Sequence, residues 1–425
     1  MKRMKHFIQT LAFLLNGVVA AGFLICAYSP YLSPVEHPVG ACAGLFIPVF
    51  IALNLAFCLV WLCLKPWGAL FPLAVFALGW NSLNAYFPVG SIKEPGEGSP
   101  TLKFLTYNTQ GISPGEGNGG ENAVLSYLRR CGADIVCLQE FIPGVHASAE
   151  EISQALEDIY PHHASTRIKG GDVLACYSRY PILETEGIAY PSLYNGSVLY
   201  RIKVGEDTLA VINNHLESNK LDAYDKKVYN EILKSPREAN VKAEGKHLLR
   251  KLADAVALRA PQADSVARAI RENRADYMLV CGDFNDSPVS YAYRVIGEGL
   301  DDAFVAAGAG PGFTYNQNHL YFRIDHIFVS PAFRVLECKV DRSIRASDHY
   351  PVWCIVERTQ RRKGAELKEI EHRGTEARRN KYIKKVKTIE PDFYSVNSVL
   401  SKNKALCLCV SVFHSIFSQT NFVLL

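Results

Sequence analysis

Charged side chains are scarce in the first part of this 425-residue sequence. From residue 1 to about residue 88, hardly any occur beyond the cluster Lys2, Arg3 and Lys5. From about residue 102 to residue 357 the balance of residue types is that of an ordinary soluble domain, and from residue 358 onward it becomes basic and polar, then apolar. The chain is therefore not one uniform globular domain.

Cysteines with a metal-site or disulfide pattern are also lacking. Of the twelve cysteines, none has the spacing of a zinc site with a paired partner. Cys137, Cys281 and Cys354 lie inside apolar, strand-like runs, where cysteine acts as a small buried hydrophobe. These features argue against a structural zinc site and against a disulfide framework, and no internal repeat is present.

The middle of the chain lacks an excess of basic residues. Between residues 100 and 358 there are 28 Lys and Arg against 33 Asp and Glu, a net charge of −5, whereas residues 359–425 hold 13 against 6, a net of +7. A basic nucleic-acid footprint is thus not visible in the net charge of the central region. This weakens the case for a polymeric nucleic-acid substrate without excluding one.

Three long apolar runs occupy residues 1–90. They extend from Phe7 to Tyr28, from Gly40 to Leu64 and from Trp67 to about Phe87, and each is long enough to cross a bilayer. A secretory signal peptide could imitate the first run, but two more follow at once, and none precedes a convincing cleavage site. The sequence predicts a membrane anchor of three transmembrane helices.

The basic residues in the short loops predict the orientation of this anchor. Lys2, Arg3 and Lys5 precede the first span and Lys65 lies between the second and third, while the loop 29–39 has no Lys or Arg. By the positive-inside rule the N-terminus is cytoplasmic, so three crossings place the rest of the chain on the extracytoplasmic side. A Gly-, Pro- and Ser-rich linker is expected over residues 91–101.

A catalytic domain is expected over residues 102–357, where short apolar strands alternate with fewer amphipathic helices, as in a layered α/β sandwich. The charged insertion 219–246 is either a solvated loop and helix or a flap on the substrate side. Charges on the helix expected over residues 245–273, Arg259 among them, are assigned to its solvent face. A basic, disordered tail is expected over residues 358–425, with a fourth span near its end left open.

Polar side chains that suit phosphate chemistry lie at the ends of several predicted strands. Hydrolysis of a phosphate ester needs a metal to withdraw charge from the phosphoryl oxygens, a base to activate water and donors to hold the non-bridging oxygens. Magnesium prefers carboxylate oxygens and keeps several waters, so one or two acidic ligands suffice. The candidates in chain order are Asn108, Glu140, His215, Asp283, Asn285, Asp325, Asp348 and His349.

The order of the motifs around these residues is more specific than any one of them. A strand ending in asparagine is followed by LQE, NHLES, GDFND, RIDHIF and SDHYPV. Any one of the residues could simply end a strand or form a turn, but together and in this order they resemble the endonuclease/exonuclease/phosphatase superfamily over residues 102–357. The resemblance implies a four-layer α/β sandwich, two packed mixed β-sheets flanked by helices, and a Mg²⁺ cofactor, with Mn²⁺ as a possible substitute.

The resemblance also implies which residues bind the metal. Glu140 resembles the principal Mg²⁺ ligand, and Asp348 resembles the second acidic group near the metal. Asn108 resembles the amide that helps to place either the metal or the phosphate.

The same resemblance assigns catalytic roles. His215 resembles the histidine that contacts the phosphate, and Asp283 resembles the carboxylate that orients or deprotonates the attacking water. Asn285 resembles the amide beside it, which also contacts the substrate. Asp325 and His349 resemble an Asp–His pair in which the carboxylate fixes the imidazole tautomer. Whether Asp283 or His349 acts as the base stays open.

The leading interpretation is a metal-dependent phosphoesterase of a bacterial-type inner membrane, anchored in the bilayer by its N-terminal helices. Its substrate is a phosphodiester or phosphomonoester, with a nucleic acid (a DNA or RNA endonuclease) and a phospholipid head group (a sphingomyelinase-like or phosphoinositide phosphoesterase) as the alternatives. A rival of another class is a catalytically silent membrane adaptor. A sensor or transporter is disfavoured because the spans contain no internal charged residue, and no segment indicates an obligate protein partner.

Overall fold

The computed structural model describes residues 2–115, 121–234, 241–273, 275–317 and 320–358. These residues belong to one structural unit, Met1–Arg358. The tail expected beyond residue 358 lies outside the described residues. The N-terminal helices are α1 (Lys2–Tyr28), η1 (Ser29–Tyr31), α2 (Pro38–Ala41), η2 (Cys42–Phe46), α3 (Ile47–Leu64), η3 (Pro66–Ala69), α4 (Leu70–Leu78) and α5 (Trp80–Tyr86).

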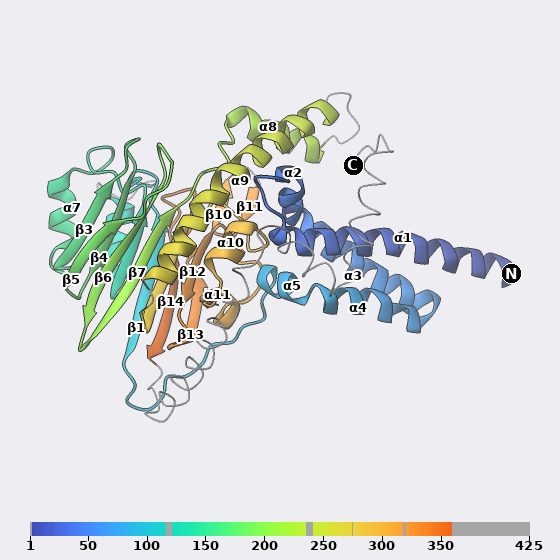
Figure 1. Ribbon diagram of the computed structural model, residues 1–425, viewed down its shortest axis with the longest axis horizontal. Helices are drawn as coiled ribbons and strands as arrows, with labels where there is room; N and C mark the ends of the chain where they lie inside the picture. The colour runs from blue at the N-terminus through green and yellow to red at the C-terminus, as the bar shows by residue number, and fades with distance from the viewer. Residues whose placement is uncertain (1, 116–120, 235–240, 274, 318–319, 359–425) are drawn as a thin grey trace, which may run out of the picture. The chain divides into compact units, whose positions relative to one another are not determined.

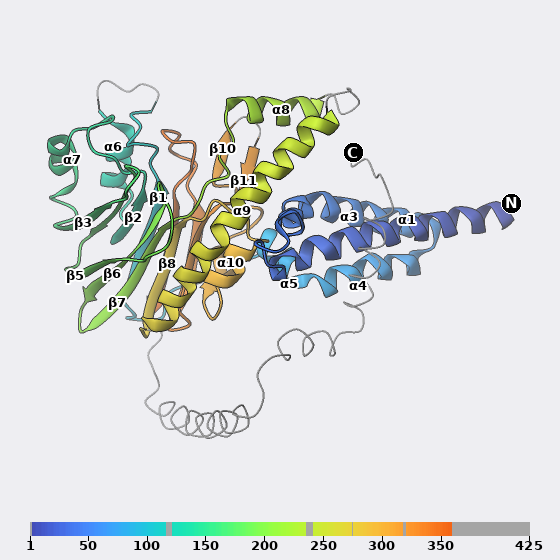
Figure 2. The same ribbon diagram turned by 45° about the horizontal axis from the view of Figure 1, so that its top comes forward.

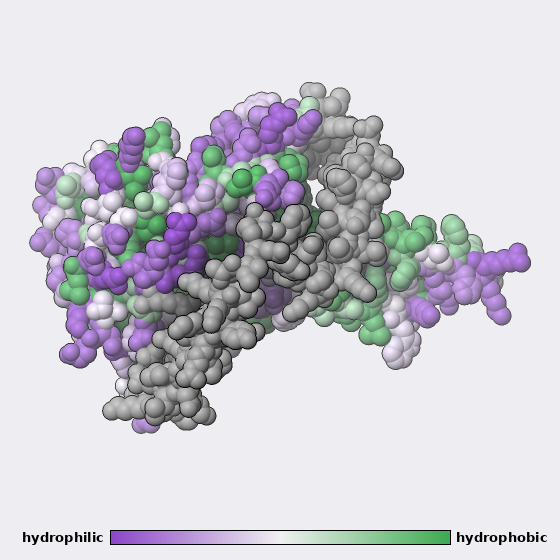
Figure 3. Space-filling model, viewed as in Figure 1, coloured by the Kyte–Doolittle hydropathy of each residue, from purple (hydrophilic) through white to green (hydrophobic). Residues whose placement is uncertain are grey.

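Two helical stretches of this N-terminal part, Lys2–Tyr31 and Pro38–Leu64, are long and apolar enough to cross a membrane by length and composition. The third expected span is different, because Gly79 interrupts it between α4 and α5. A Cβ atom at Gly79 would collide with the ring of Phe23 on α1, so the glycine lets the two helices approach closely. The apolar surface gathers on these helices, whereas polar residues cover much of the rest of the molecule (Figure 3).

Two mixed six-stranded sheets form the rest of the fold (Figures 1 and 2). The first has the order β13-β14-β1-β2-β4-β3, and the second has the order β5-β6-β7-β8-β12-β9. The strands of the first sheet are β1 (Thr101–Asn108), β2 (Ile135–Gln139), β3 (His162–Arg167), β4 (Val173–Ser178), β13 (Phe333–Val340) and β14 (Val352–Arg358). Those of the second are β5 (Ile182–Gly187), β6 (Gly196–Val204), β7 (Asp207–His215), β8 (Tyr277–Asp283), β9 (Asp301–Asp302) and β12 (Asp325–Val329).

Apolar faces of the two sheets pack on each other, and helices cover the outer faces. The buried cysteines Cys137, Cys281 and Cys354 lie in the core between the sheets and are free, as expected for small buried hydrophobes. The remaining elements are α6 (Ala123–Arg130) and α7 (Ala149–Leu156) on the first sheet, α9 (Val241–Glu272) and α10 (Tyr291–Ile296) on the second, α8 (Ala223–Lys234), α11 (Ala303–Ala307), and the hairpin β10 (Tyr315–Gln317) and β11 (Leu320–Phe322). The expected pair of mixed sheets flanked by helices is confirmed.

The pairing of parallel strands brings the predicted site residues at their carboxyl ends together. The parallel strands β1 and β2 pair Asn108 with Gln139, and the parallel strands β7 and β8 pair His215 with Asp283. Beneath these ends, the Gln139 amide donates to the Asn213 side chain at 2.6 Å, and the Asn213 amide donates to the Leu138 carbonyl at 3.0 Å. These buried bonds tie the two sheets together directly below the strand ends.

The expected linker lies along the sandwich. The Lys93 amide donates to the Leu336 carbonyl at 2.8 Å, and the Gly96 amide donates to the carboxylate of Glu357 at 3.1 Å. Arg334 donates to the Glu94 carbonyl at 2.8 Å. The segment is therefore hydrogen-bonded to β13 and β14, and β1 begins at Thr101, one residue earlier than expected.

The N-terminal helices pack against the sandwich next to the loop that follows β8. Val289 of this loop is buried in one apolar cluster with Phe23 and Ile47. A Cβ atom at Gly44 would collide with the carbonyl oxygen of Val289, so the backbones approach closely there. The guanidinium of Arg294 donates to the Pro30 carbonyl at 2.8 Å. The two parts thus share a packed interface.

Candidate active site

The predicted residues at the strand ends meet in one site. Asn108, at the end of β1, donates through its amide nitrogen to the carboxylates of Glu140 at 3.1 Å and Asp283 at 3.0 Å. Glu140 follows β2 of the first sheet, and Asp283 ends β8 of the second. Asn108 therefore links the two sheets at their common edge. In this geometry the N–H groups of Asn108 orient the two carboxylates. The side chain of Asn108 thus turns its nitrogen, and not its oxygen, toward the acidic residues.

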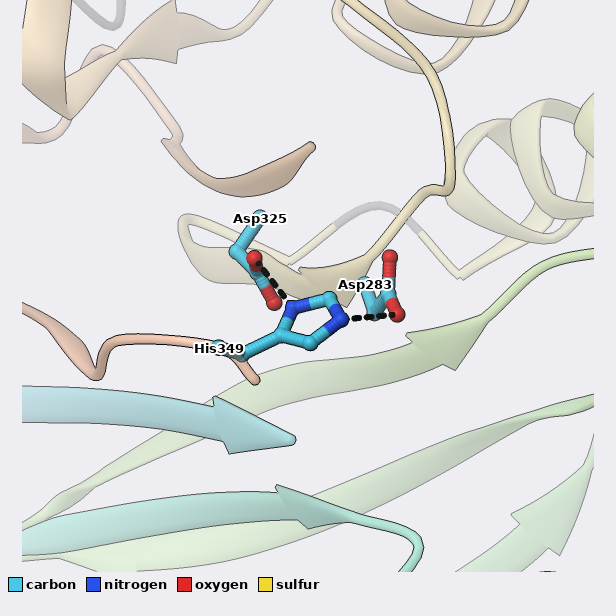
Figure 4. Close-up of side chains that lie close together, drawn as sticks. All are labelled: Asp283, Asp325 and His349. Carbon is cyan, nitrogen blue, oxygen red and sulfur yellow. Dashed lines mark hydrogen bonds and ion pairs between the residues drawn. The ribbon is translucent and has the colours of Figure 1, made fainter. Parts of the chain in front are cut away.

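His349 and Asp325 form the predicted pair. The Nδ1 atom of His349 lies 2.8 Å from Asp325 Oδ2, and its Nε2 atom lies 3.6 Å from Asp283 Oδ2. The imidazole lies between the two carboxylates (Figure 4). Because the Asp325 carboxylate holds the Nδ1 side of the ring, the Nε2 atom is directed at Asp283.

A second pair of the same kind also lies near Asp283. The Nδ1 atom of His215 lies 2.7 Å from Asp172 Oδ2, and its Nε2 atom lies 3.8 Å from both Asp283 and Glu140. The sequence analysis missed Asp172, which comes directly after Gly170 and Gly171 and before the wholly buried strand β4. An acidic residue between a glycine turn and a buried strand was the only available signal, and it is weak.

Strained backbone shapes the edge of this site. Gln110, Glu140 and Asn285 all have positive φ, at 48°, 48° and 52°. This conformation is costly for residues other than glycine and persists where the surrounding structure imposes it, often at functional sites. The side-chain nitrogen of Asn285 donates to the Leu216 carbonyl at 2.9 Å, which leaves its second N–H and the side-chain oxygen for other partners. Its predicted contact with substrate stays a prediction.

Burial and neighbouring charges shift the pKa values at the centre of the site in opposite directions. Burial raises the pKa of Asp283 and of Glu140, and the neighbouring histidines counteract that rise. Burial disfavours the charged form of His215, but Asp172 and the nearby carboxylates outweigh it and raise the pKa to about 9. Asp325 and Asp283 likewise raise the pKa of His349 well above its usual value against the effect of burial. Two imidazoles that favour their protonated form therefore face one carboxylate.

The acidic residues fit a hard divalent cation on the Glu140 side. The Glu140 side chain is about one third exposed and Asp348 is half-buried, so a cation held by them could keep several waters, as Mg²⁺ prefers. Asp283, Asp325 and His349 also lie close enough together to hold a metal. Those three are buried, and the Asp325–His349 hydrogen bond already uses two of their ligand atoms. That Glu140 and Asp348 hold the cation stays a prediction.

Arg259 corrects the expectation that the charges of its helix face solvent. Its side chain is fully buried, with 0% of the residue exposed. It donates to the carboxylate of Asp286 at 2.6 Å, to the side chain of Asn219 at 2.7 Å and to the carbonyl of Glu217 at 2.8 Å. The guanidinium thus holds the loops after β7 and β8, which follow His215 and Asp283, against α9.

Comparisons with known proteins agree with this arrangement. Residues 7–86 match a domain of unknown function (DUF8431), and residues 105–349 match the Endonuclease/Exonuclease/phosphatase family. No curated protein matches the chain.

Among solved structures, the chain is similar to an endonuclease/exonuclease/phosphatase from Beutenbergia cavernae DSM 12333, at 17% identity and a TM-score of 0.41, over 61% of this chain and 72% of the other. Truncated TDP2 from Caenorhabditis elegans has 17% identity and a TM-score of 0.42, over 61% and 98%. An endonuclease/exonuclease/phosphatase from Bacteroides vulgatus has 16% identity and a TM-score of 0.42, over 61% and 100%. Since the family match covers more than half of the chain and includes all eight predicted site residues, the chain belongs to the endonuclease/exonuclease/phosphatase family.

Proposed function

We propose that this protein is a metal-dependent phosphoesterase that hydrolyses a phosphodiester or phosphomonoester by attack of water. Members of its family typically hydrolyse phosphoesters and depend on a metal. One observation carries the proposal: two imidazoles, each held by its own carboxylate, direct Nε2 at the single carboxylate of Asp283. Structural packing alone does not call for so many ionisable groups at one partly open edge.

The proposed roles follow from this geometry. A divalent cation held by Glu140 and Asp348 would withdraw charge from the phosphoryl oxygens. Asp283 accepts the proton of the attacking water, since its carboxylate is the common acceptor at the centre of the site. The Nε2 atom of His349 faces the same carboxylate and orients it, and Asp325 keeps the imidazole in place.

The remaining side chains hold the substrate. His215, fixed by Asp172, donates from Nε2 to a non-bridging oxygen. Asn108 keeps the carboxylates of Glu140 and Asp283 aligned. A catalytically silent adaptor would be expected to have gaps in this constellation, and among the described residues every predicted member is present.

The proposal includes a membrane location. Residues 1–90 form an anchor that crosses a bacterial-type inner membrane three times, residues 91–101 connect it to the catalytic domain of residues 102–357, and that domain faces the extracytoplasmic side. The apolar N-terminal helices and the distribution of basic residues in the short loops support this. The substrate is then a nucleic acid or a phospholipid head group that reaches the outer face of the membrane.

The test uses the full chain in detergent with Mg²⁺ and the chromogenic diester bis(4-nitrophenyl) phosphate. We expect EDTA to abolish turnover, and Asp283→Asn and His349→Ala each to lower kcat by at least ~10²-fold, the scale of acid–base groups. Asp301→Asn is the matched control, because Asp301 is exposed and pairs with the end of β12 that lies away from Asp325. Undiminished turnover in EDTA, or a folded Asp283→Asn variant as active as the control, would refute the proposal.

A further inference from the structure

The hairpin β10–β11 places an aromatic ring directly beside His349. The ring of Tyr315 meets the imidazole edge-on, with centroids 5.3 Å apart, and the two residues form a backbone bridge. The neighbours of Tyr315 reinforce this position: the Asn316 amide donates to the Asp348 carbonyl at 3.1 Å, and the Tyr350 amide donates to the Thr314 carbonyl at 2.7 Å. Tyr315 is therefore a fixed wall of the active site.

The insertion after β7 brings a cation to the same wall. The Lys226 ammonium of α8 lies 5.6 Å from the centroid of the Tyr315 ring. Since that ring is 5.3 Å from the imidazole, the ammonium is within about 11 Å of the centre of His349. Lys226 therefore lies near the side of the site that Tyr315 forms.

The helix that carries Lys226 is itself held in place. Asp222 and Asp225 cap its first turn reciprocally, with N–H···O distances of 2.9 and 3.0 Å. The ammonium of Lys251 on α9 donates to both carboxylates. Lys226 is thus presented by a docked helix and not by a free loop.

The charge of Lys226 is not neutralised by an acidic side chain. No carboxylate of the described residues forms a salt bridge with it, whereas the adjacent Lys227 pairs with Glu231 at 3.7 Å. Its ring contact with Tyr315 leaves the N–H groups of the ammonium available to an anion.

We propose that Lys226 is a substrate-binding residue whose ammonium contacts a phosphate oxygen of the bound phosphoester, with Tyr315 forming the wall beneath it. This assignment rests on the proposed function, and it makes Lys226 of α8, within the charged insertion, a part of the substrate site. The ammonium of Lys226 already lies over the ring that contacts His349.

The test compares Lys226→Met, Lys226→Arg and Lys227→Met in the full chain in detergent. Methionine keeps the apolar stem on the Tyr315 ring and removes the charge, and Lys227→Met is the matched control one residue away. For bis(4-nitrophenyl) phosphate with Mg²⁺ we expect Lys226→Met to raise KM by about tenfold or more, as for loss of a charge-assisted hydrogen bond, with kcat within about twofold. Lys226→Arg should restore most of the loss, and Lys227→Met should match the wild type.

A second measurement, equilibrium dialysis of inorganic phosphate with Mg²⁺, does not depend on turnover. We expect the Kd for phosphate to rise in Lys226→Met by a similar factor. The Kd should also depend less on salt concentration, because one charge–charge contact is lost. A wild type that binds phosphate through Lys226 but hydrolyses neither the diester nor the monoester 4-nitrophenyl phosphate would support this inference and refute the proposed function. An active wild type with an unchanged KM and Kd in Lys226→Met, or no rescue by arginine, would overturn the inference alone. A wild type that hydrolyses neither ester and does not bind phosphate would overturn both.

Discussion

Replacing Arg259 by methionine tests whether the buried guanidinium holds the loops of the active site. The variant keeps most of the side-chain volume but leaves the carboxylate of Asp286, which is only 8% exposed, without its partner. It also removes the hydrogen bonds to the Asn219 side chain and the Glu217 carbonyl. Breaking a buried ion pair from one side costs about 3–5 kcal/mol. That is a large share of the roughly 5–15 kcal/mol that stabilises a typical domain.

Thermal unfolding of the full chain in detergent measures this loss. A destabilisation of that size should lower Tm by roughly 5–15 °C, given a few degrees per kcal/mol for chains of this size. The double variant Arg259→Met/Asp286→Asn removes both charges and should recover most of the loss, because no unpaired buried charge remains. Arg268→Met, at an exposed position on the same helix, is the control and should change stability by less than about 0.5 kcal/mol. A single variant at Arg259 as stable as this control, or a double variant worse than the single one, would refute the reasoning.

Three further predictions concern the site and the tail. Asp172→Asn should lower kcat by about tenfold or more in the diester assay, because His215 loses the acceptor that directs its Nε2 atom; unchanged turnover would remove Asp172 from the site. Glu140→Gln should raise the Mg²⁺ concentration for half-maximal activity by at least about tenfold, measured by metal titration, and an unchanged titration curve would move the metal elsewhere. Truncation after Arg358 should leave Tm and kcat unchanged, because β14 is complete at that residue; loss of folding would show that residues 359–425 pack on the domain.

Much of the fold follows from patterns that are local in the sequence. In the helix Ala123–Arg130 the buried positions Val124, Leu125 and Leu128 follow helical spacing, which is visible in the sequence. The site residues Asn108 and Asp283 could be predicted for a related reason. Each ends an apolar strand, and strands that run in the same direction bring such ends to one edge of a sheet.

The features that were missed or misjudged depend on contacts between distant segments. Asp172 acquires its role only because β4 brings it to His215, 43 residues further along the chain. Arg259 has the charge of a solvent-facing residue, and only the loops folded over α9 make its position interior. The break at Gly79 depends on the ring of Phe23 from another helix, which no hydropathy pattern reveals.

The close approach of Gly44 to Val289 affects how the molecule unfolds. Val289 is six residues from Asp283, and it is buried among side chains of the N-terminal helices rather than within the sandwich. Without those helices Val289 would be an exposed apolar residue in the loop that follows Asp283. The composition of the sequence changes near residue 100, but this change does not separate two units that unfold independently. We expect the N-terminal helices and the loop after β8 to unfold together in a single transition.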